Sequence, residues 1–332
     1  MTAEQIKLLF DAFVNIKVGV VGDIMLDTYW WGKVDRISPE APVPVVAVSK
    51  REQRIGGAGN VALNLQSLGA QVHIISMLGA DAEGEELSAL MTTQNVNTEY
   101  LLKSSHRITT NKIRIISKNQ HMLRLDAEIT HPLAPDDEKL VIEKFRQYLE
   151  QEKPQIVILE DYNKGVLTEN VIEAIIALCK QHKVFTAVDP KRKNFFAYKG
   201  VNIFKPNLHE AKEGLNIVGD EVNAHLLKHI HSALYEKLQH DTSLITLSEK
   251  GVYFQTATDA QLIPTHIRSI ADVSGAGDSV IAVAAIVFAA TQNVKLMAEI
   301  ANIAGGLVCE EVGTVAINKE RLLQECEALL AK

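Results

Sequence analysis

Short apolar runs alternate with longer amphipathic stretches along most of the chain. The apolar runs are four or five residues long and rich in β-branched residues, which predicts strands buried on both faces. Between several of them, apolar residues recur every three or four positions, which predicts helices at 60–68, 83–94 and 170–182. The alternation is typical of an α/β protein with a mostly parallel central sheet and helices on both faces. The predicted strands are 18–21, 73–77, 155–159, 184–188, 201–204 and 244–247.

Two segments depart from this alternation, because strand-like runs follow one another there without a helix. They are 42–48 and 107–124, and the second is interpreted as two strands joined near 118–120. Such strands are expected to form an antiparallel addition whose exposed face is covered by substrate, core or a second subunit. No long linker or repeat divides the chain. We therefore expect one domain over 1–332, with a small β lid formed by about 33–50 and 98–128.

Composition and charge narrow the class of protein. The chain has 332 residues, of which 47% are hydrophobic and 23% charged, as in ordinary globular proteins. Its net charge of -7 argues against a nucleic-acid partner. The longest apolar run, 280–290, is shorter than the roughly 20 residues of a membrane span. We expect a cytoplasmic protein without a membrane segment. Its cysteines, Cys179, Cys309 and Cys326, form no CxxC pair and are expected to be free thiols.

The sharpest local motif is DVSGAGDS at 272–279, which leads into the apolar helical run. Gly275, Ala276 and Gly277 allow a tight turn at a helix start, where free N–H groups can hold an anion. Such groups can also stabilise the charge on a transferring phosphoryl group. Asp278 lies at the same helix start, and its carboxylate can accept a proton from an attacking hydroxyl. Taken alone, the motif also fits a glycine turn with an aspartate cap on a buried helix.

Two segments near the N-terminus have residue types that bind sugars. Asp27 follows the first strand in GDIMLD, and ligands collect at the carboxyl ends of parallel strands. A solvated turn aspartate fits Asp27 equally well, and Asp23 suits either a sugar contact or a structural cap. The turn in IGGAGNVALNLQSLG contains Gly56, Gly57 and Asn60 and runs into a helix. Its spacing is not the GxGxxG of dinucleotide-binding proteins, which argues against a dehydrogenase.

Two further segments suit a nucleotide and its metal ion. Asn207 and Glu210 in KPNLHE lie three residues apart on one face of a helical turn. Such a pair can organise Mg²⁺ and its waters near ATP phosphates, although it also fits a helix capping box. In LITLSEKG, Ser248 and Gly251 belong to a turn that follows a strand.

In their order along the chain, these motifs resemble the signatures of ribokinase/PfkB carbohydrate kinases, which are GGxxxN, NxxE and DTxGAGD. Valine and serine replace the middle residues of the last signature here. The resemblance implies a ribokinase-like fold, Asp278 as catalytic base with the backbone of 275–278 as anion hole, and ATP with Mg²⁺ at Asn207 and Glu210, through water. It implies that Gly56, Gly57 and Asn60 contact the sugar. It also suggests that Ser248 and Gly251 lie beside the nucleotide.

The string WWGKVDRISPEAPVPVV at 30–46 is more narrowly similar to the heptose-7-phosphate kinases of bacterial lipopolysaccharide-core assembly, as are LRLDAE, EDYNKGVL and VDPKRKNF. The family reaction uses ATP to convert D-glycero-β-D-manno-heptose 7-phosphate into the 1,7-bisphosphate. A substrate that already carries a phosphate needs cations. Within the family-like motifs these are expected to be Arg124, Lys164 and Lys191, whereas Asp161 and Asp189 suit either hydroxyl contacts or turn caps.

The same resemblance bears on partners and further cofactors. The family's lid strands pair two subunits, so we expect a homodimer through the β lid. CEEVGT at 309–314 is similar to a tail segment that flanks adenine and, in many relatives, a monovalent-cation loop, so K⁺ is an optional cofactor. Many members fuse the kinase to a nucleotidyltransferase. This sequence has no HxGH-type motif, and is expected to be monofunctional or the kinase part of a longer protein.

Two other functions fit part of the pattern. The first is a PfkB kinase for another phosphosugar, such as fructose 1-phosphate or tagatose 6-phosphate, and the segment 35–45 argues against it. The second is a non-catalytic sugar-phosphate sensor with the same fold. The intact Asp278 and the GAGD and NxxE motifs argue against a sensor.

Overall fold

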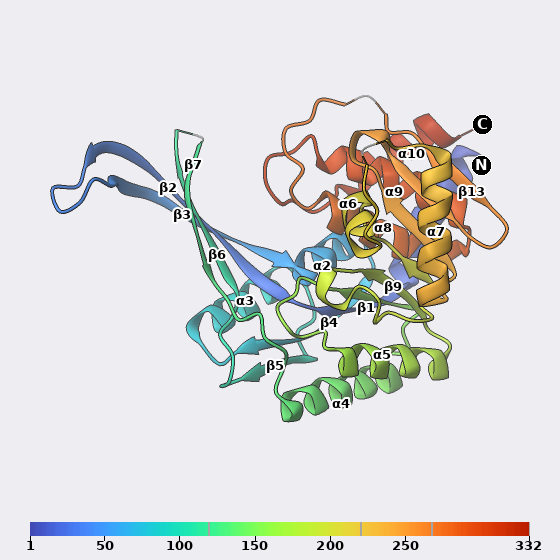
Figure 1. The fold of residues 1–332 in the computed structure, drawn as a ribbon, viewed down its shortest axis with the longest axis horizontal. Helices are drawn as coiled ribbons and strands as arrows, with labels where there is room; N and C mark the ends of the chain where they lie inside the picture. Colours follow the sequence, from blue (N-terminus) through green and yellow to red (C-terminus); the bar gives the residue numbers. More distant parts are fainter. Residues whose placement is uncertain (119, 220, 267, 332) are drawn as a thin grey trace.

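The computed structural model describes residues 1–332 except 119, 220, 267 and 332. Its centre is a nine-stranded sheet (Figure 1). The strands, in spatial order, are β13 (Ala260–Ile263), β12 (Val252–Gln255), β11 (Thr242–Thr246), β10 (Ile203–Phe204), β9 (Phe185–Asp189), β8 (Ile156–Glu160), β1 (Lys17–Gly22), β4 (Gln71–Gly79) and β5 (Leu101–Ser104). Neighbouring strands from β11 to β5 are parallel, whereas β12 and β13 are antiparallel additions at one edge.

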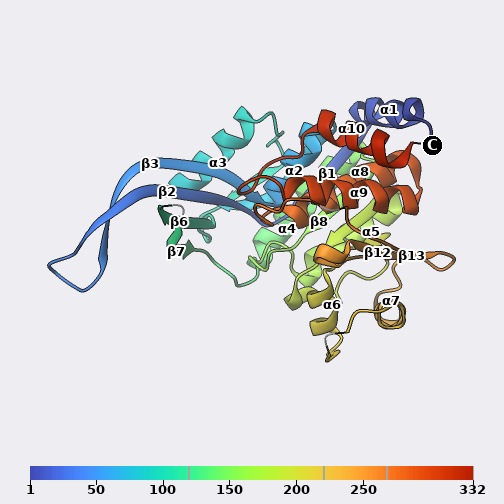
Figure 2. The same ribbon diagram turned by 90° about the horizontal axis from the view of Figure 1, so that it is seen from above.

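Helices cover both faces of this sheet (Figures 1 and 2). They are α1 (Ala3–Ala12), α2 (Ala58–Ser67), α3 (Ala82–Thr93), α4 (Pro135–Glu152), α5 (Glu169–His182), α6 (Leu208–Gly214), α7 (Ala224–Leu238), α8 (Ala276–Thr291), α9 (Val294–Val308) and α10 (Lys319–Leu330). In β8, Ile156 and Ile158 pack in the core beneath α2, α8 and α9, whereas Val157 and Leu159 pack in the core beneath α4, α5 and α7. Successive strand residues point to opposite faces, so an uninterrupted apolar run serves both cores.

The α/β architecture predicted from the sequence is confirmed. Each predicted strand and helix of the large sheet is present within a few residues of its expected bounds. The main difference is β10, which has only two residues, because Ile203 and Phe204 alone pair with β9 and β11. The cysteines are free, as expected. Among the described residues, no helix is both long and apolar enough to cross a membrane.

A second sheet of four strands projects from the main body (Figure 1). We call it the lid sheet, and its strands in spatial order are β3 (Pro44–Gly57), β2 (Ile24–Ile37), β6 (Asn111–Ser117) and β7 (Gln120–Ala127). The sequence pattern had suggested a wholly antiparallel addition. That expectation is wrong in one place, because β2 and β6 pair in parallel. The segment 98–128 also includes β5, which pairs with β4 in the large sheet. The strand junction near 118–120 includes residue 119, outside the described residues.

Strands β2 and β3 connect the lid sheet to the main body. The first six residues of β2 and the last three of β3 are buried, and the far part of each strand is mostly exposed. β2 starts directly after the loop that contains Asp23, and β3 ends at Gly57, the N-cap of α2. Both strands therefore run without interruption from the lid sheet into the loops that were expected to bind sugar.

Candidate active site

The two glycine signatures meet at the carboxyl edge of the large sheet. Asn60 in the first turn of α2 donates from Nδ2 to Oδ2 of Asp278 in the first turn of α8, at 2.7 Å. These residues are 218 positions apart, and both are buried. Gly275 comes within reach of the same amide, because a Cβ there would lie 3.0 Å from Asn60 Nδ2. Its φ of +78° also favours glycine.

The N-terminus of α8 presents free donors beside this contact. Gly275 is the N-cap and has no side-chain cap, and the N–H groups of Gly277 and Asp278 have no acceptor among the described residues. The preceding loop is fixed by Asp272, which accepts hydrogen bonds from Ser274 and from the N–H of Gly313. Free first-turn N–H groups at the positive end of a helix dipole suit a phosphate. The turn and free donors expected at 275–278 are therefore present.

Asp278 has both carboxylate oxygens hydrogen-bonded. Oδ2 accepts from Asn60, and Oδ1 accepts from the hydroxyl of Tyr162 at 2.7 Å. Burial raises the pKa of Asp278 to about 6, while these two hydrogen bonds oppose the rise. The carboxyl group is therefore mostly ionised at neutral pH, and its pKa is close enough to neutral for it to accept a proton.

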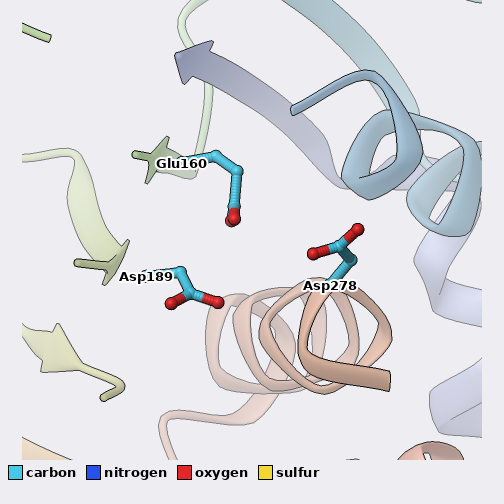
Figure 3. A group of neighbouring side chains, drawn as sticks. All are labelled: Glu160, Asp189 and Asp278. Atoms are coloured by element: carbon cyan, nitrogen blue, oxygen red, sulfur yellow. The ribbon is translucent and has the colours of Figure 1, made fainter. Parts of the chain in front are cut away.

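Two further carboxyl groups face Asp278. Glu160 ends β8 and Asp189 ends β9, and the three side chains point toward one another, with oxygens within 4.8 Å (Figure 3). Burial opposes ionisation of Asp189, but Lys191 and Lys205 lower its pKa through contacts of 3.2 and 2.8 Å. Glu160 is 0% exposed, and neither of its carboxyl oxygens has a partner among the described residues. Burial, and then Asp189, raise its pKa well above the ordinary value, so we expect a neutral carboxylic acid.

These three carboxyl groups do not fit a metal ion, although their spacing is short enough. Both oxygens of Asp278 accept hydrogen bonds, from Asn60 and Tyr162. Both oxygens of Asp189 face lysine ammonium groups. Lys191 and Lys205 offset the charge of Asp189, and Glu160 is expected to be neutral, whereas a hard divalent ion needs several charged oxygen ligands at once. We therefore assign no metal to this cluster.

Asn207 and Glu210 form a reciprocal capping box at the start of α6. Asn207 Oδ1 accepts from the N–H of Glu210, and Glu210 Oε2 accepts from the N–H of Asn207, each at 2.8 Å. Glu210 Oε1 also accepts from Lys191 at 2.8 Å, which ties this pair to Asp189. The capping-box interpretation is confirmed. Because each carboxylate oxygen has a further lone pair, the same pair also fits a hydrated Mg²⁺ ion.

Ser248 and Gly251 close a turn after β11, as the sequence indicated. Ser248 is exposed with a φ of +52°, and its carbonyl accepts from the N–H of Gly251 at 3.1 Å. The end of β11 lies beside the N-cap of α6, because Thr246 and Asn207 form a β-bridge. The turn and the capping box are therefore neighbours at one edge of the sheet.

Asp27 is buried on β2 and is not a solvated turn residue. Its Oδ1 accepts from Arg114 on β6 at 2.6 Å. Gly56 gives the carboxylate room, because a Cβ there would lie 2.3 Å from Asp27 Oδ2. Arg114 and Arg54 both lie over the ring of Tyr29, at 5.2 and 5.0 Å from its centroid. The sugar end therefore has an acid–arginine pair that the sequence motifs did not identify.

Asp23 and Asp161 hold the loop that follows β8. Asp23 accepts from three backbone N–H groups of the segment 162–166. Asp161 accepts from the N–H of Asn163 and from the Tyr198 hydroxyl, both at 2.7 Å. In each case the structure favours the capping interpretation, and Asp161 is turned toward Tyr198 while its neighbour Glu160 enters the cluster.

The expected phosphate-binding cations are held by acidic neighbours. Lys164 contacts Glu128 at 2.8 Å, and Lys191 bridges Asp189 and Glu210. Arg124 lies on β7, where its 57%-exposed side chain pairs with Asp126. Lys191 thus lies between Asp189 and Glu210, whereas Arg124 belongs to the lid sheet.

Three residues of this region were not identified from the sequence: Glu160, Tyr162 and Arg114. Glu160 had a usable signal, because it is the last residue of an apolar parallel strand, where ligands gather. Tyr162 follows two residues later in the same loop. Arg114 had no local signal, because its place depends on how β6 pairs with β2.

A free helix start beside a buried carboxylate, at the carboxyl edge of a parallel α/β sheet, suits phosphoryl transfer to a small molecule. Residues 15–321 match the model of the pfkB family of carbohydrate kinases, and the chain belongs to that family. Its enzyme class is that of an ATP-dependent sugar kinase.

Curated relatives and solved structures agree with this assignment. The chain is 38% identical over 314 residues to "Bifunctional protein HldE" of Desulfatibacillum aliphaticivorans, covering 93% of this chain and 63% of the relative. It is 39% identical over 300 residues to the protein of that name from Campylobacter fetus subsp. fetus, covering 90% and 64%. The chain thus spans less than two thirds of the length of either relative.

Two solved structures show the fold. Phosphofructokinase-2 from Escherichia coli in complex with potassium superimposes with a TM-score of 0.77 at 17% identity, over 96% of this chain and 99% of that one. Arabidopsis thaliana ribokinase complexed with ribose and ATP gives a TM-score of 0.72 at 16% identity, over 93% and 99%.

Proposed function

We propose that the protein transfers the γ-phosphoryl group of ATP to the anomeric hydroxyl of D-glycero-β-D-manno-heptose 7-phosphate. The product is the 1,7-bisphosphate, a heptose precursor of the lipopolysaccharide core. The observation that carries the chemistry is the doubly hydrogen-bonded Asp278 beside free N–H groups of α8. The choice of heptose is supported by the resemblance of 30–46 to heptose-7-phosphate kinases and by the relatives named HldE.

The sugar would lie between Asp27, Asn60 and the lid sheet, with its anomeric hydroxyl at Asp278. The Asp278 carboxylate takes the hydroxyl proton as the anomeric oxygen attacks the γ-phosphorus. A bond forms between that oxygen and phosphorus, the bond to the β-phosphate oxygen breaks, and ADP leaves. The N–H groups of Gly277 and Asp278 stabilise charge on the transferring group.

The nucleotide would extend from this helix start toward α6. Mg²⁺, which accompanies ATP, neutralises phosphate charge when bound, and Asn207 with Glu210 would hold it through water. The turn of Ser248 and Gly251 would lie beside the nucleotide. K⁺ remains an optional cofactor, and the loop fixed by Asp272 against the 309–314 segment is the place proposed for it.

The substrate's own phosphate would bind to the face of the lid sheet that carries Asp27. Arg114 on β6 and Arg124 on β7 are direct cross-strand partners, and Tyr29 on β2 is the partner of Arg114. Directly opposed residues share one face of a sheet, so both guanidinium groups belong to this face. Arginine suits bidentate phosphate binding. Lys164, beside Glu128, and Lys191, beside Asp189, are proposed as further substrate contacts.

The opposite face of the lid sheet supports the proposed homodimer. It carries the apolar cross-strand pairs Ile113–Leu125 and Ile115–Leu123, and Leu123 and Leu125 are 53% and 44% exposed. A contiguous exposed apolar face needs a cover, which a second copy of the lid sheet would supply. We expect L123E to convert a dimer into a monomer, with T258E as the exposed control. Light scattering after size exclusion measures the mass, and a dimeric L123E would contradict the interface.

The function is tested with ATP and a panel of sugars: heptose 7-phosphate, fructose 1-phosphate, fructose 6-phosphate, tagatose 6-phosphate and ribose. Phosphorus NMR identifies the product. A new anomeric phosphate on heptose 7-phosphate alone supports the proposal. Preference for another sugar keeps the kinase chemistry and removes the heptose assignment. Transfer to none of them favours a sugar-phosphate sensor.

A further inference from the structure

The side chain of Tyr162 is directed at the proposed catalytic base. Its hydroxyl donates to Oδ1 of Asp278 at 2.7 Å, and the ammonium of Lys191 lies 5.5 Å from its ring centroid. Burial, and then the nearby Asp278 charge, raise the pKa of Tyr162 well above the ordinary value. The hydroxyl therefore keeps its proton at neutral pH and remains a donor.

The loop that carries Tyr162 is fixed from below by a buried carboxylate. Asp23 is 1% exposed and accepts from the N–H groups of Tyr162, Lys164 and Val166 at 2.9, 2.9 and 3.0 Å. Arg107 donates to the Lys164 carbonyl of the same loop. Burial raises the pKa of Asp23, and the three N–H bonds oppose this. Because its hydrogen bonds come from backbone N–H groups, the Asp23 carboxylate fixes the position of the loop residues that donate them.

Tyr162 and Asn60, which are far apart in the sequence, both donate hydrogen bonds to Asp278. Tyr162 binds Oδ1 of Asp278 and Asn60 binds Oδ2, so rotation of the carboxylate would break both hydrogen bonds. Each carboxylate oxygen has more than one lone pair. A substrate hydroxyl can therefore reach Asp278 while both donors stay bound.

We propose that Tyr162 is a positioning residue, whose hydroxyl holds the Asp278 carboxylate in the single orientation used for proton acceptance. The inference rests on the proposed function, in which Asp278 is the base. Misplacement of a catalytic group by about 1 Å can lower a rate by about 100-fold, so fixing this rotation affects turnover more than binding.

The acidic limb of the kcat/KM profile reports the pKa of Asp278. Tyr162 would not affect this pKa if its role were only to support the fold. The groups that face Asp278 are Glu160 from β8, Asp189 from β9 and Lys205 from the segment before α6, together with neutral Asn60 and Tyr162. Donation from Tyr162 lowers the pKa of Asp278, which burial has raised to about 6. Removing the hydroxyl must therefore raise that pKa and move the acidic limb of kcat/KM to higher pH.

The experiment compares Y162F with Y198F. Tyr198 is a matched control, because it donates to the Asp161 carboxylate at the same 2.7 Å and does not contact Asp278. For Y162F we expect kcat to fall about 10- to 100-fold. We also expect the acidic limb to move upward, and KM for ATP to stay within about twofold of the wild type because the base does not bind ATP. Y198F should leave the limb unchanged. An unmoved limb in Y162F would overturn the proposal.

A second variant covers failure of Y162F to fold. Site-specific 3-fluorotyrosine at position 162 keeps the ring and strengthens the donor, so the limb should move to lower pH. No movement would again overturn the proposal. Failure of the part of the proposed function on which the inference rests, Asp278 as the base, is distinguishable, because D278N would then retain wild-type turnover. If D278N is inactive and both Tyr162 variants keep the wild-type profile, the inference alone is wrong.

Discussion

The base end and the lid end of the proposed sugar site are built by different means. Around Asp278, the charged groups are almost fully buried and are bound by side-chain donors. On the lid sheet, Arg124 is 57% exposed and pairs with Asp126 on the same strand. Buried hydrogen bonds between fixed groups are strong, whereas exposed ion pairs contribute about 0–1 kcal/mol. Substitutions at the base end should therefore lower activity more than substitutions at the lid end.

The largest expected effect separates the base end from the rest of the molecule. D278N removes the proton acceptor, so kcat should fall about 10²- to 10⁴-fold while KM for ATP changes little. In the wild type, kcat/KM should decline below about pH 6, because Asp278 has a pKa of about 6 and is protonated there. Steady-state kinetics from pH 5 to 9 measure both. D259N, on an exposed turn, is the control. Near-normal turnover in D278N would remove the base assignment.

An intermediate effect is expected at the lid end. R114A removes the partner of Asp27 and a guanidinium beside Tyr29, so KM for the phosphosugar should rise by about 10- to 100-fold. Turnover at saturation should change by much less, because Arg114 does not contact Asp278. R146A, exposed on α4, should match the wild type. Kinetics with heptose 7-phosphate and with heptose lacking the phosphate sharpen the test. An equal rise in KM for both sugars would mean that Arg114 orients Asp27 and does not bind the phosphate.

The smallest effect concerns stability at the base end. The folded pKa of Glu160 is raised, so its stabilising contribution is full below its ordinary pKa of 4.5 and is lost as pH rises. E160Q keeps the shape without the ionisation. Its Tm should therefore fall less than that of the wild type between pH 5 and 9, by a few degrees. Scanning calorimetry measures both curves, with the exposed E249Q variant as control. If Tm varied with pH in the same way for E160Q and the wild type, Glu160 would already be ionised in the folded protein at pH 5.

The parts of the site that depend on local backbone geometry were predictable from the sequence. Gly275 and Asp278 lie where a helix must start, and Gly56 and Asn60 lie in a turn that leads into another helix. Parallel topology brings such loops to one edge of a sheet. The contact between Asn60 and Asp278 follows from those two facts together.

Side-chain direction was not predictable at the end of β8. Glu160 and Asp161 are adjacent acids, and the sequence analysis considered only Asp161, for either a hydroxyl contact or a turn cap. Successive residues point to opposite sides, so a shift of one residue in where the strand ends exchanges their roles. The structure turns Glu160 toward Asp278 and turns Asp161 toward Tyr198.

The pairing of β2 with β6 could not be predicted from the sequence for a different reason. Arg114 reaches Asp27 across 87 residues, through the parallel pairing of β2 with β6. Nothing in either segment specifies that partner or its register, because both are amphipathic strands with several possible neighbours. The hydrogen bond from Tyr162 to Asp278 is likewise set by packing between β8 and α8.

Strands β2 and β3 are each 14 residues long and continuous from the projecting tip to the sugar loops. At about 3.3 Å per residue, each strand is roughly 45 Å long. The buried end of β2 carries Asp27, and the buried end of β3 carries Gly56. The projecting part of the lid sheet and the residues proposed to bind the sugar therefore share the same two strands. A second copy bound to the lid sheet, as proposed above, would therefore restrain the backbone of the residues proposed to bind the sugar.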